Sequence, residues 1–175
     1  MMTRIFFVRH GEVDNPDKVM YGRLPGFPLS QNGRNQIAKT AQLLSKENIS
    51  AIYSSPLLRT KQTAEIISEI LYLPINYSEE ILEVRTSLQG KTFSYVSDHF
   101  PKMNVYITVK NNPSDETIKD IAKRMQEFVD KIIKKHKGQK IIVVGHGDPI
   151  MILKAKIERL PMEIDSLRPA KGYIQ

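Results

Sequence analysis

The sequence predicts an α/β protein, a three-layer α/β/α sandwich around a mainly parallel central sheet. Short, continuously apolar runs alternate along the chain with segments of helical periodicity. A strand covered by helices on both faces is apolar along its whole length, and parallel sheets are built from such strands. In these sheets, ligands bind in the crevice beyond the carboxyl ends of the strands. We therefore expect the functional residues where the apolar runs end.

Three apolar runs are expected to form buried strands: residues 5–8, 49–55 ("ISAIYSS") and 140–144 ("KIIVV"). A shorter extended piece is expected at the start of "LPINYSEEILEV". If the strands are parallel, their carboxyl ends deliver polar side chains to one edge of the sheet. The three main strands would end near Val8, Ser54 and Val144.

Two helices are expected in the first half of the chain. Ser30 can cap a helix that runs to about Glu47, because a serine side chain accepts a hydrogen bond from the first helical N–H groups. Pro56 lies where a second helix can start, since the N–H that proline lacks would be unpaired there. Apolar residues at helical spacing give each helix an inner face: Ile37, Ala41 and Leu44 in the first, and Ala64, Ile67 and Leu71 in the second.

Three further helices are expected in the second half. A short one is expected near "FSYVSDHF", residues 93–100. Ser114, with Asp115 and Glu116 behind it, is expected to open the longest helix, because acidic residues in a first turn favour the helix dipole. Pro149 can start the last helix. The inner faces would be Ile118, Ile121, Met125, Phe128 or Val129, and Ile132 in the long helix, and Ile150, Leu153 and Ile157 in the last.

Length and composition favour one globular domain over residues 1–175, in a cytoplasmic protein. The apolar runs are too short to span a membrane, the N-terminus lacks a signal-peptide pattern, and the chain has no cysteine. The net charge is +7, but acidic residues interrupt the lysines of "KRMQEFVDKIIKKHKGQK". We interpret this run as a solvated helix face and expect no nucleic-acid binding, although the charge would attract anionic substrates.

Side chains suited to binding phosphate follow three of the expected strands. They are Arg9 with His10, then Arg59 from "SSPLLRTKQTAEII", then His146 from "VVGHGDPI". Two guanidiniums can make paired hydrogen bonds to phosphate oxygens, and two histidines add donors or a nucleophile. A glycine such as Gly147 would let the backbone approach a ligand closely. We expect no cofactor and no metal ion, because two arginines in the same crevice would repel a dication.

Together these motifs resemble the histidine phosphatase superfamily, which includes cofactor-dependent phosphoglycerate mutase. "FFVRHGEVDN" is similar to the family signature, and "PLSQNGRNQ" to the turn into its first helix. "YSSPLLRTKQTAEII" resembles the second phosphate-binding segment, while "ILEV" and "VVGHGDPI" are similar to those carrying the acid/base carboxylate and the second histidine. The resemblance covers most of the chain and implies a phosphoglycerate mutase-like fold and a phosphoric monoester hydrolase of the histidine acid phosphatase type.

The resemblance implies a role for each catalytic candidate. His10 would be the phosphorylated histidine, with one ring nitrogen held by a backbone carbonyl near Gly11 and the other free to attack. Arg9, Arg59 and a protonated His146 would hold the equatorial phosphate oxygens.

Glu83 would protonate the leaving group and then activate water. Glu79 and Glu80 are nearby alternatives for this role, and Glu83 could instead be a surface carboxylate paired with Arg85 or a lysine.

Substrate contacts beyond the phosphate are expected from two regions. Asn15 would hydrogen-bond the transferring group, and Gly147 would lie against it. Tyr21, Gly22 and Arg23 would touch the rest of the substrate, although Tyr21 and Arg23 could equally be turn residues. Residues 85–113 are expected to form a variable, substrate-facing segment.

Several functions remain open. A mutase would return the phosphate to a bound intermediate, but the short middle segment favours an open site in which water is the acceptor. A non-catalytic phospho-ligand-binding module is a second alternative. The expected partner is a small phosphate ester, whether a sugar phosphate, a phosphoglycerate, a nucleotide-like or cofactor-precursor phosphate, or a phosphoprotein. The sequence leaves a homodimer open.

Overall fold

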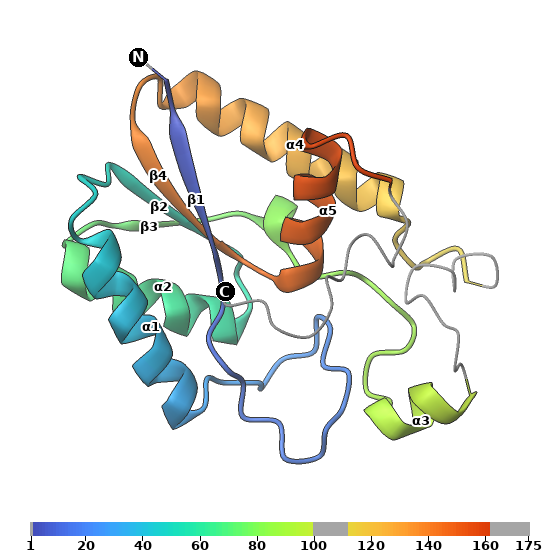
Figure 1. Ribbon diagram of the computed structural model, residues 1–175. Coiled ribbons are helices and arrows are strands. Elements are labelled where there is room, and N and C mark those ends of the chain that lie inside the picture. Colours follow the sequence, from blue (N-terminus) through green and yellow to red (C-terminus); the bar gives the residue numbers. More distant parts are fainter. Residues whose placement is uncertain (1, 100–111, 162–175) are drawn as a thin grey trace.

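A computed structural model describes residues 2–99 and 112–161, leaving out residues 1, 100–111 and 162–175 (Figure 1). Its strands form one sheet in which every pairing is parallel, in the order β1-β4-β2-β3. The strands are β1 (Arg4–Arg9), β2 (Ala51–Ser54), β3 (Ile75–Tyr77) and β4 (Lys140–Gly145). The predicted strands are confirmed, and β3 is the short extended piece expected after residue 72.

Helices cover both faces of the sheet, which confirms the three-layer prediction. Helices α1 (Gln31–Leu44) and α2 (Leu58–Leu71) pack on one face, and α4 (Ile118–Lys135) and α5 (Gly147–Ile157) pack on the other (Figure 1). Alternate residues of β4 separate the two cores: Ile141 and Val143 face α4 and α5, whereas Ile142 and Val144 face α1 and α2. All four side chains are buried, which accounts for the continuous apolar run from Ile141 to Val144.

The register of the sheet brings the strand ends together. In β4, Val144 pairs with Val8 of β1 on one side and with Ser54 of β2 on the other. The polar residues that follow these three positions therefore emerge at one edge of the sheet, as the sequence predicts.

Helix α1 begins where expected but ends early. The Ser30 side chain accepts a hydrogen bond from Gly33 N and caps the helix, as predicted. The helix ends at Leu44, before Glu47, because the chain tightens into a turn: Glu47 N bonds Leu44 O at 3.0 Å. Asn48 then takes a left-handed φ of 48°. Helix α2 starts two residues after Pro56 and places Arg59 in its first turn, as expected.

Two helix starts differ from the predictions. Helix α4 is capped by Thr117, whose side chain accepts from Asp120 N while the Asp120 carboxylate accepts from Thr117 N. Ser114 is therefore not the cap, and Asp115 and Glu116 precede the helix. The helix dipole is not their partner, because both side chains are buried and bond to other segments.

Helix α5 starts at Gly147, with His146 at the N-cap, so Pro149 lies inside the first turn and does not open the helix.

The middle of the chain is mostly irregular. A 3₁₀ turn, η1 (Glu79–Ile81), is followed by a loop and by α3 (Phe93–His99), the short helix expected there. Part of the predicted substrate-facing segment, residues 100–111, lies outside the described residues, so that role and the single-domain assignment stay predictions. In the part of the chain that the structure describes, no helix combines the length and apolar character needed to cross a membrane.

The N-cap of α4 gives a direct test of where that helix begins. We expect Thr117→Ala to lower the free energy of unfolding by about 1 kcal/mol, because it removes one half of a reciprocal cap. Ser114→Ala is the matched control and should change it by less than about 0.5 kcal/mol. Urea denaturation of both variants measures the difference, and a larger effect at Ser114 would contradict the observed helix start.

Candidate active site

His10 is held at the carboxyl end of β1 by its backbone and by its ring. Its N–H donates to Gly145 O at 3.1 Å, which continues the pairing of β1 with β4 by one residue. Its ring Nδ1 lies 2.8 Å from Gly11 O. A carbonyl oxygen only accepts, so Nδ1 carries the proton and Nε2 keeps its lone pair. The predicted anchor near Gly11 is confirmed.

The surroundings of His10 keep its imidazole neutral. The side chain is buried, and burial is the main cause that lowers its pKa to about 3. Arg59 and Arg9 lower the pKa further, while the hydrogen bond to Gly11 opposes the shift. Across the physiological pH range His10 is therefore an uncharged base with a free Nε2.

The backbone around His10 is tightly packed against two helices. A Cβ on Gly11 would lie 2.6 Å from Gly33 O of α1, a separation that side chains do not reach. Gly11 N donates to Thr63 Oγ1 at 3.2 Å, and that hydroxyl donates to Arg59 O at 2.8 Å. Only glycine fits at position 11, and the contacts tie the loop after β1 to the helix that carries Arg59.

Arg59 is a buried arginine with an unused donor. The residue is only 1% exposed. Its Nη2 donates to Gly22 O at 2.8 Å and to His146 Nδ1 at 3.2 Å. The ring of Tyr21 covers the guanidinium, with Cζ 4.6 Å from the ring centroid. Among the described residues, Arg59 Nε is the buried side-chain nitrogen that lacks a hydrogen-bond partner. Burying an unpaired donor costs about 1–3 kcal/mol, so an oxyanion at this point would remove a penalty.

His146 is fully buried between Arg59 and Ser55. A guanidinium only donates, so His146 Nδ1 accepts from Arg59 and Nε2–H donates to Ser55 Oγ at 2.8 Å. Burial lowers the pKa of His146 well below its usual value, and the charge of Arg59 and the neighbouring His10 lower it further. The prediction of a protonated His146 is therefore wrong for this arrangement, because the imidazolium would lie buried beside a guanidinium.

Arg9 reaches the same edge from the last position of β1. A Cβ on Gly147 would lie 3.3 Å from Arg9 Nε and 3.4 Å from its Cζ. The arginine side chain therefore runs against the first residue of α5, and the glycine leaves room for it.

Glu83 lies beside His146, on the segment after η1. Its Oε2 is 3.7 Å from His146 Nδ1, and its Oε1 accepts from Val84 N at 2.9 Å. Burial is the main cause that raises the pKa of Glu83 to about 7, and the charge of Asp148 adds to it. The hydrogen bond from Val84 N and the charges of Arg59 and Arg9 oppose the shift. A carboxyl group with this pKa can donate or accept a proton near neutral pH.

The alternatives to Glu83 lie elsewhere. Glu79 is exposed, and Glu80 pairs with Lys131 of α4. The Glu83 side chain is only 15% exposed, so its interpretation as a surface carboxylate paired with Arg85 or a lysine is wrong.

The catalytic candidates converge on one point. The ring centroids of His10 and His146 are 5.4 Å apart, and one polar atom of each of His10, Glu83 and His146 lies within 4.8 Å of the others. Two imidazoles and a carboxylate are a donor set that could hold zinc. Arg59, 3.2 Å from His146 Nδ1, would repel a dication there, and this repulsion favours a reaction without a metal. The absence of a metal from the reaction stays a prediction.

The predicted substrate contacts are placed less uniformly. Tyr21 forms a wall of the site, 6.4 Å from the His10 ring, and Gly22 supplies the carbonyl that Arg59 binds. Asn15 instead closes a turn, because its amide bonds both Val19 N and Val19 O. Arg23 donates through Nε to Glu83 O at 2.6 Å. Contacts of these residues with a substrate stay predictions.

Two residues that orient the site were missed from sequence. Ser55 follows the last residue of β2, so the strand-end argument that selected His10 could have selected it too. Thr63 lies four residues after Arg59, on the same side of α2, and its hydroxyl links that helix to Gly11. Small hydroxyl side chains are common, and neither position carried a distinctive motif.

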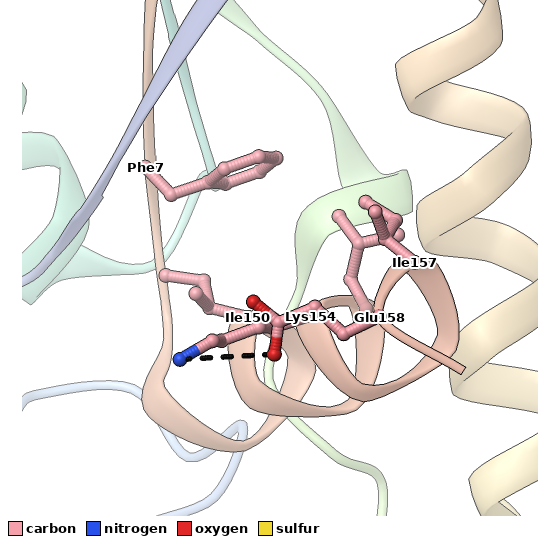
Figure 2. Close-up of a pocket in the computed structure, with 6 residues that line it drawn as sticks. Phe7, Ile150, Lys154, Ile157 and Glu158 are labelled. Carbon is pink, nitrogen blue, oxygen red and sulfur yellow. Dashed lines mark ion pairs between the residues drawn. The ribbon is translucent and has the colours of Figure 1, made fainter. Parts of the chain in front are cut away.

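A separate cavity of about 260 Å³ lies between β1 and α5 (Figure 2). Its walls are Phe7, Ile150, Leu153 and Ile157, and its polar residues, Lys154 and Glu158, pair with each other at 4.0 Å. No catalytic candidate lines this cavity, and its apolar walls do not suit a phosphate.

Known proteins resemble this chain in sequence and in structure. The family model of the histidine phosphatase superfamily (branch 1) matches residues 5–169. The uncharacterized phosphatase PhoE of Bacillus subtilis is 30% identical over 169 residues, which cover 95% of this chain and 83% of PhoE. Phosphoserine phosphatase 1 of Hydrogenobacter thermophilus is 30% identical over 158 residues, 85% of this chain and 73% of that protein. The solved structure of Bacillus stearothermophilus YhfR matches with a TM-score of 0.84 at 26% identity, over 98% of this chain and 87% of YhfR. With its parallel sheet and a family match over nearly its whole length, the chain belongs to the histidine phosphatase superfamily.

Proposed function

We propose that this protein is a phosphomonoester phosphatase that works through a phosphohistidine on His10, with Glu83 as general acid and base. One observation carries the proposal. A neutral His10 with a free Nε2 and a carboxyl group with a pKa of about 7 come within 4.8 Å of each other. The buried guanidinium of Arg59, whose Nε is unpaired, lies 3.2 Å from the neighbouring His146. A nucleophile, a proton donor and an oxyanion donor are the three groups that this two-step reaction needs.

In the first step, His10 Nε2 attacks phosphorus in line with the ester oxygen. The N–P bond forms as the P–O bond to the leaving group breaks, and Glu83 gives its proton to the departing alkoxide. Arg9 and Arg59 stabilise the charge on the equatorial oxygens. His146 contributes by fixing the Arg59 guanidinium through Nδ1.

In the second step, water attacks the phosphohistidine. Glu83, now ionised, takes a proton from the water as the P–N bond breaks and inorganic phosphate forms. The reaction returns His10 to its neutral form with the Nδ1 proton still held by Gly11 O. Each group ends in its starting state, so no cofactor is consumed.

The names of two of the similar proteins favour phosphate-ester hydrolysis. They are an uncharacterized phosphatase and a phosphoserine phosphatase, so a small phosphate ester is the substrate class that we propose here. A mutase would use the same phosphohistidine, and release of inorganic phosphate, measured against interconversion of phosphoglycerates, separates the two reactions. A cytoplasmic location, the absence of nucleic-acid binding and a homodimer stay predictions.

The role of Arg59 is tested by a substitution that keeps its charge. We expect Arg59→Lys to weaken binding of inorganic phosphate at least about tenfold, because an ammonium cannot contact Gly22, His146 and an oxyanion together. Lys61→Ala, an exchange on the same helix beside Tyr77, is the control and should leave binding unchanged. Isothermal titration measures both, and equal affinity in Arg59→Lys would remove Arg59 from the site.

The nucleophile is tested by chemical trapping. His10→Ala should abolish hydrolysis of a generic phosphomonoester and the acid-labile labelling of the protein by its phosphate. Rapid quenching followed by mass spectrometry detects the label in the native protein. Retained turnover in His10→Ala would end the covalent mechanism, whereas binding of phosphate esters without turnover in the native protein would indicate a non-catalytic module.

The acid role of Glu83 is tested by pH and by leaving group. Glu83 must hold its proton in the first step, so kcat/KM on an alkyl phosphate should fall as pH rises through about 7. Glu83→Gln should lose this alkaline limb and about 10²–10⁴-fold in kcat/KM on alkyl phosphates, but much less in kcat/KM on 4-nitrophenyl phosphate. Ionisation of the substrate affects both proteins equally, so the difference between their profiles isolates Glu83. An equal loss on both esters would rule out the acid role.

A further inference from the structure

Glu116 is a buried carboxylate that joins two arginines from different parts of the chain. Its Oε2 accepts from Arg23 Nη2 at 2.8 Å, and its Oε1 accepts from Arg124 Nε at 2.9 Å. Arg124 Nη2 adds a contact of 3.2 Å to Oε2, and Arg85 N donates to the same oxygen at 2.9 Å. Glu116 is thus fully hydrogen-bonded, although it lies outside the helix whose dipole it was expected to serve.

The two arginines meet again on the backbone of the acid/base segment. Arg23 Nε donates to Glu83 O at 2.6 Å, and Arg124 Nη2 lies 3.4 Å from the same carbonyl. Arg124 Nη1 also donates to Glu80 O at 2.8 Å. The guanidiniums therefore contact Glu116 on one side and the peptide of Glu83 on the other.

The carboxylate is what allows these cations to lie together. Burial lowers the pKa of Arg23, and Arg124 and Arg85 add to that effect, whereas the charge of Glu116 opposes it. Without the carboxylate, two partly buried guanidiniums would face each other with no counter-charge, and they would move apart toward water. The carbonyl of Glu83 would then lose the donors that fix it.

We propose that Glu116 is a positioning residue, which with Arg23 and Arg124 holds the Glu83 backbone where its carboxyl group can reach the leaving group. The inference rests on the proposed function of Glu83. The Glu83 carboxyl is held by Val84 N and lies 3.7 Å from His146, so its place depends directly on the path of this peptide. Proton transfer is sensitive to such placement, because an error of about 1 Å can cost on the order of 100-fold in rate.

The neighbouring Asp115 provides a matched control. It is buried on the same segment, but its carboxylate accepts from Ser87 N at 2.8 Å and from Ser87 Oγ at 2.9 Å, whereas Glu116 bonds Arg23 and Arg124. A purely structural role for this segment would make Asp115→Asn and Glu116→Gln equivalent in their effects on catalysis.

The experiment compares kcat/KM of Glu116→Gln, Asp115→Asn and Glu83→Gln on aryl and alkyl phosphates whose leaving groups differ in basicity, because kcat/KM reports the phosphorylation of His10, in which Glu83 is the acid. Glu116→Gln should lose about 10- to 100-fold in kcat/KM on alkyl phosphates and little in kcat/KM on 4-nitrophenyl phosphate. Asp115→Asn should lower the melting temperature without changing the ratio of the two rates. The double variant Glu116→Gln/Glu83→Gln should be no slower than Glu83→Gln alone, since both changes act on one proton transfer.

An equal loss of kcat/KM in Glu116→Gln on all esters, no loss at all, or an additive loss in the double variant would overturn the positioning role. If Glu83→Gln itself shows no dependence on the leaving group, the proposed function fails and the inference falls with it. Arg23→Lys is the second test if Glu116→Gln does not fold. It keeps the charge beside Glu116 but removes the Nε donor to Glu83 O, and it should show the same dependence on the leaving group.

Discussion

The arrangement of the site depends on the hydrogen-bond register of β4 between β1 and β2. The pairing extends past the strands on both sides, because His10 N bonds Gly145 O and Ser55 N bonds Val144 O. Backbone hydrogen bonds therefore fix the position of His10, the proposed nucleophile, on one side of β4. On the other side they fix Ser55, which orients His146. A slip of one residue would turn each of these side chains to the opposite face of the sheet.

Burial assigns the protonation states. Removal from water disfavours charge, so it lowers the pKa of His10 to about 3 and raises the pKa of Glu83 to about 7. Both shifts suit the proposed first step, which needs a neutral base and a protonated acid. Arg59 remains a cation in the same surroundings, with one N–H unpaired. Such a donor lowers stability, a cost that functional sites commonly carry.

The sequence predicts the parts of the structure whose signals are local. An apolar run followed by Arg9 and His10, or by His146, identifies both a buried strand and the residues at its carboxyl end. The predicted start of α4 was wrong because Asp115 and Glu116 have the composition of a helical first turn. Their actual partners, Ser87 and Arg23, are distant in sequence. The predicted protonated state of His146 was wrong for a similar reason, since the pKa of this side chain depends on its burial and on the guanidinium of Arg59 from α2.

The central claim is that Arg9, Arg59 and His10 surround one phosphoryl group, and a crystal structure with orthovanadate tests it most directly. Vanadate takes the five-coordinate geometry of phosphoryl transfer. The account predicts vanadium bonded to His10 Nε2 at an axial position, equatorial oxygens within hydrogen-bonding distance of Arg59 Nε and Arg9, and Glu83 beside the opposite axial oxygen. Vanadate bound away from His10, or in the site with Arg59 Nε still unpaired, would contradict it.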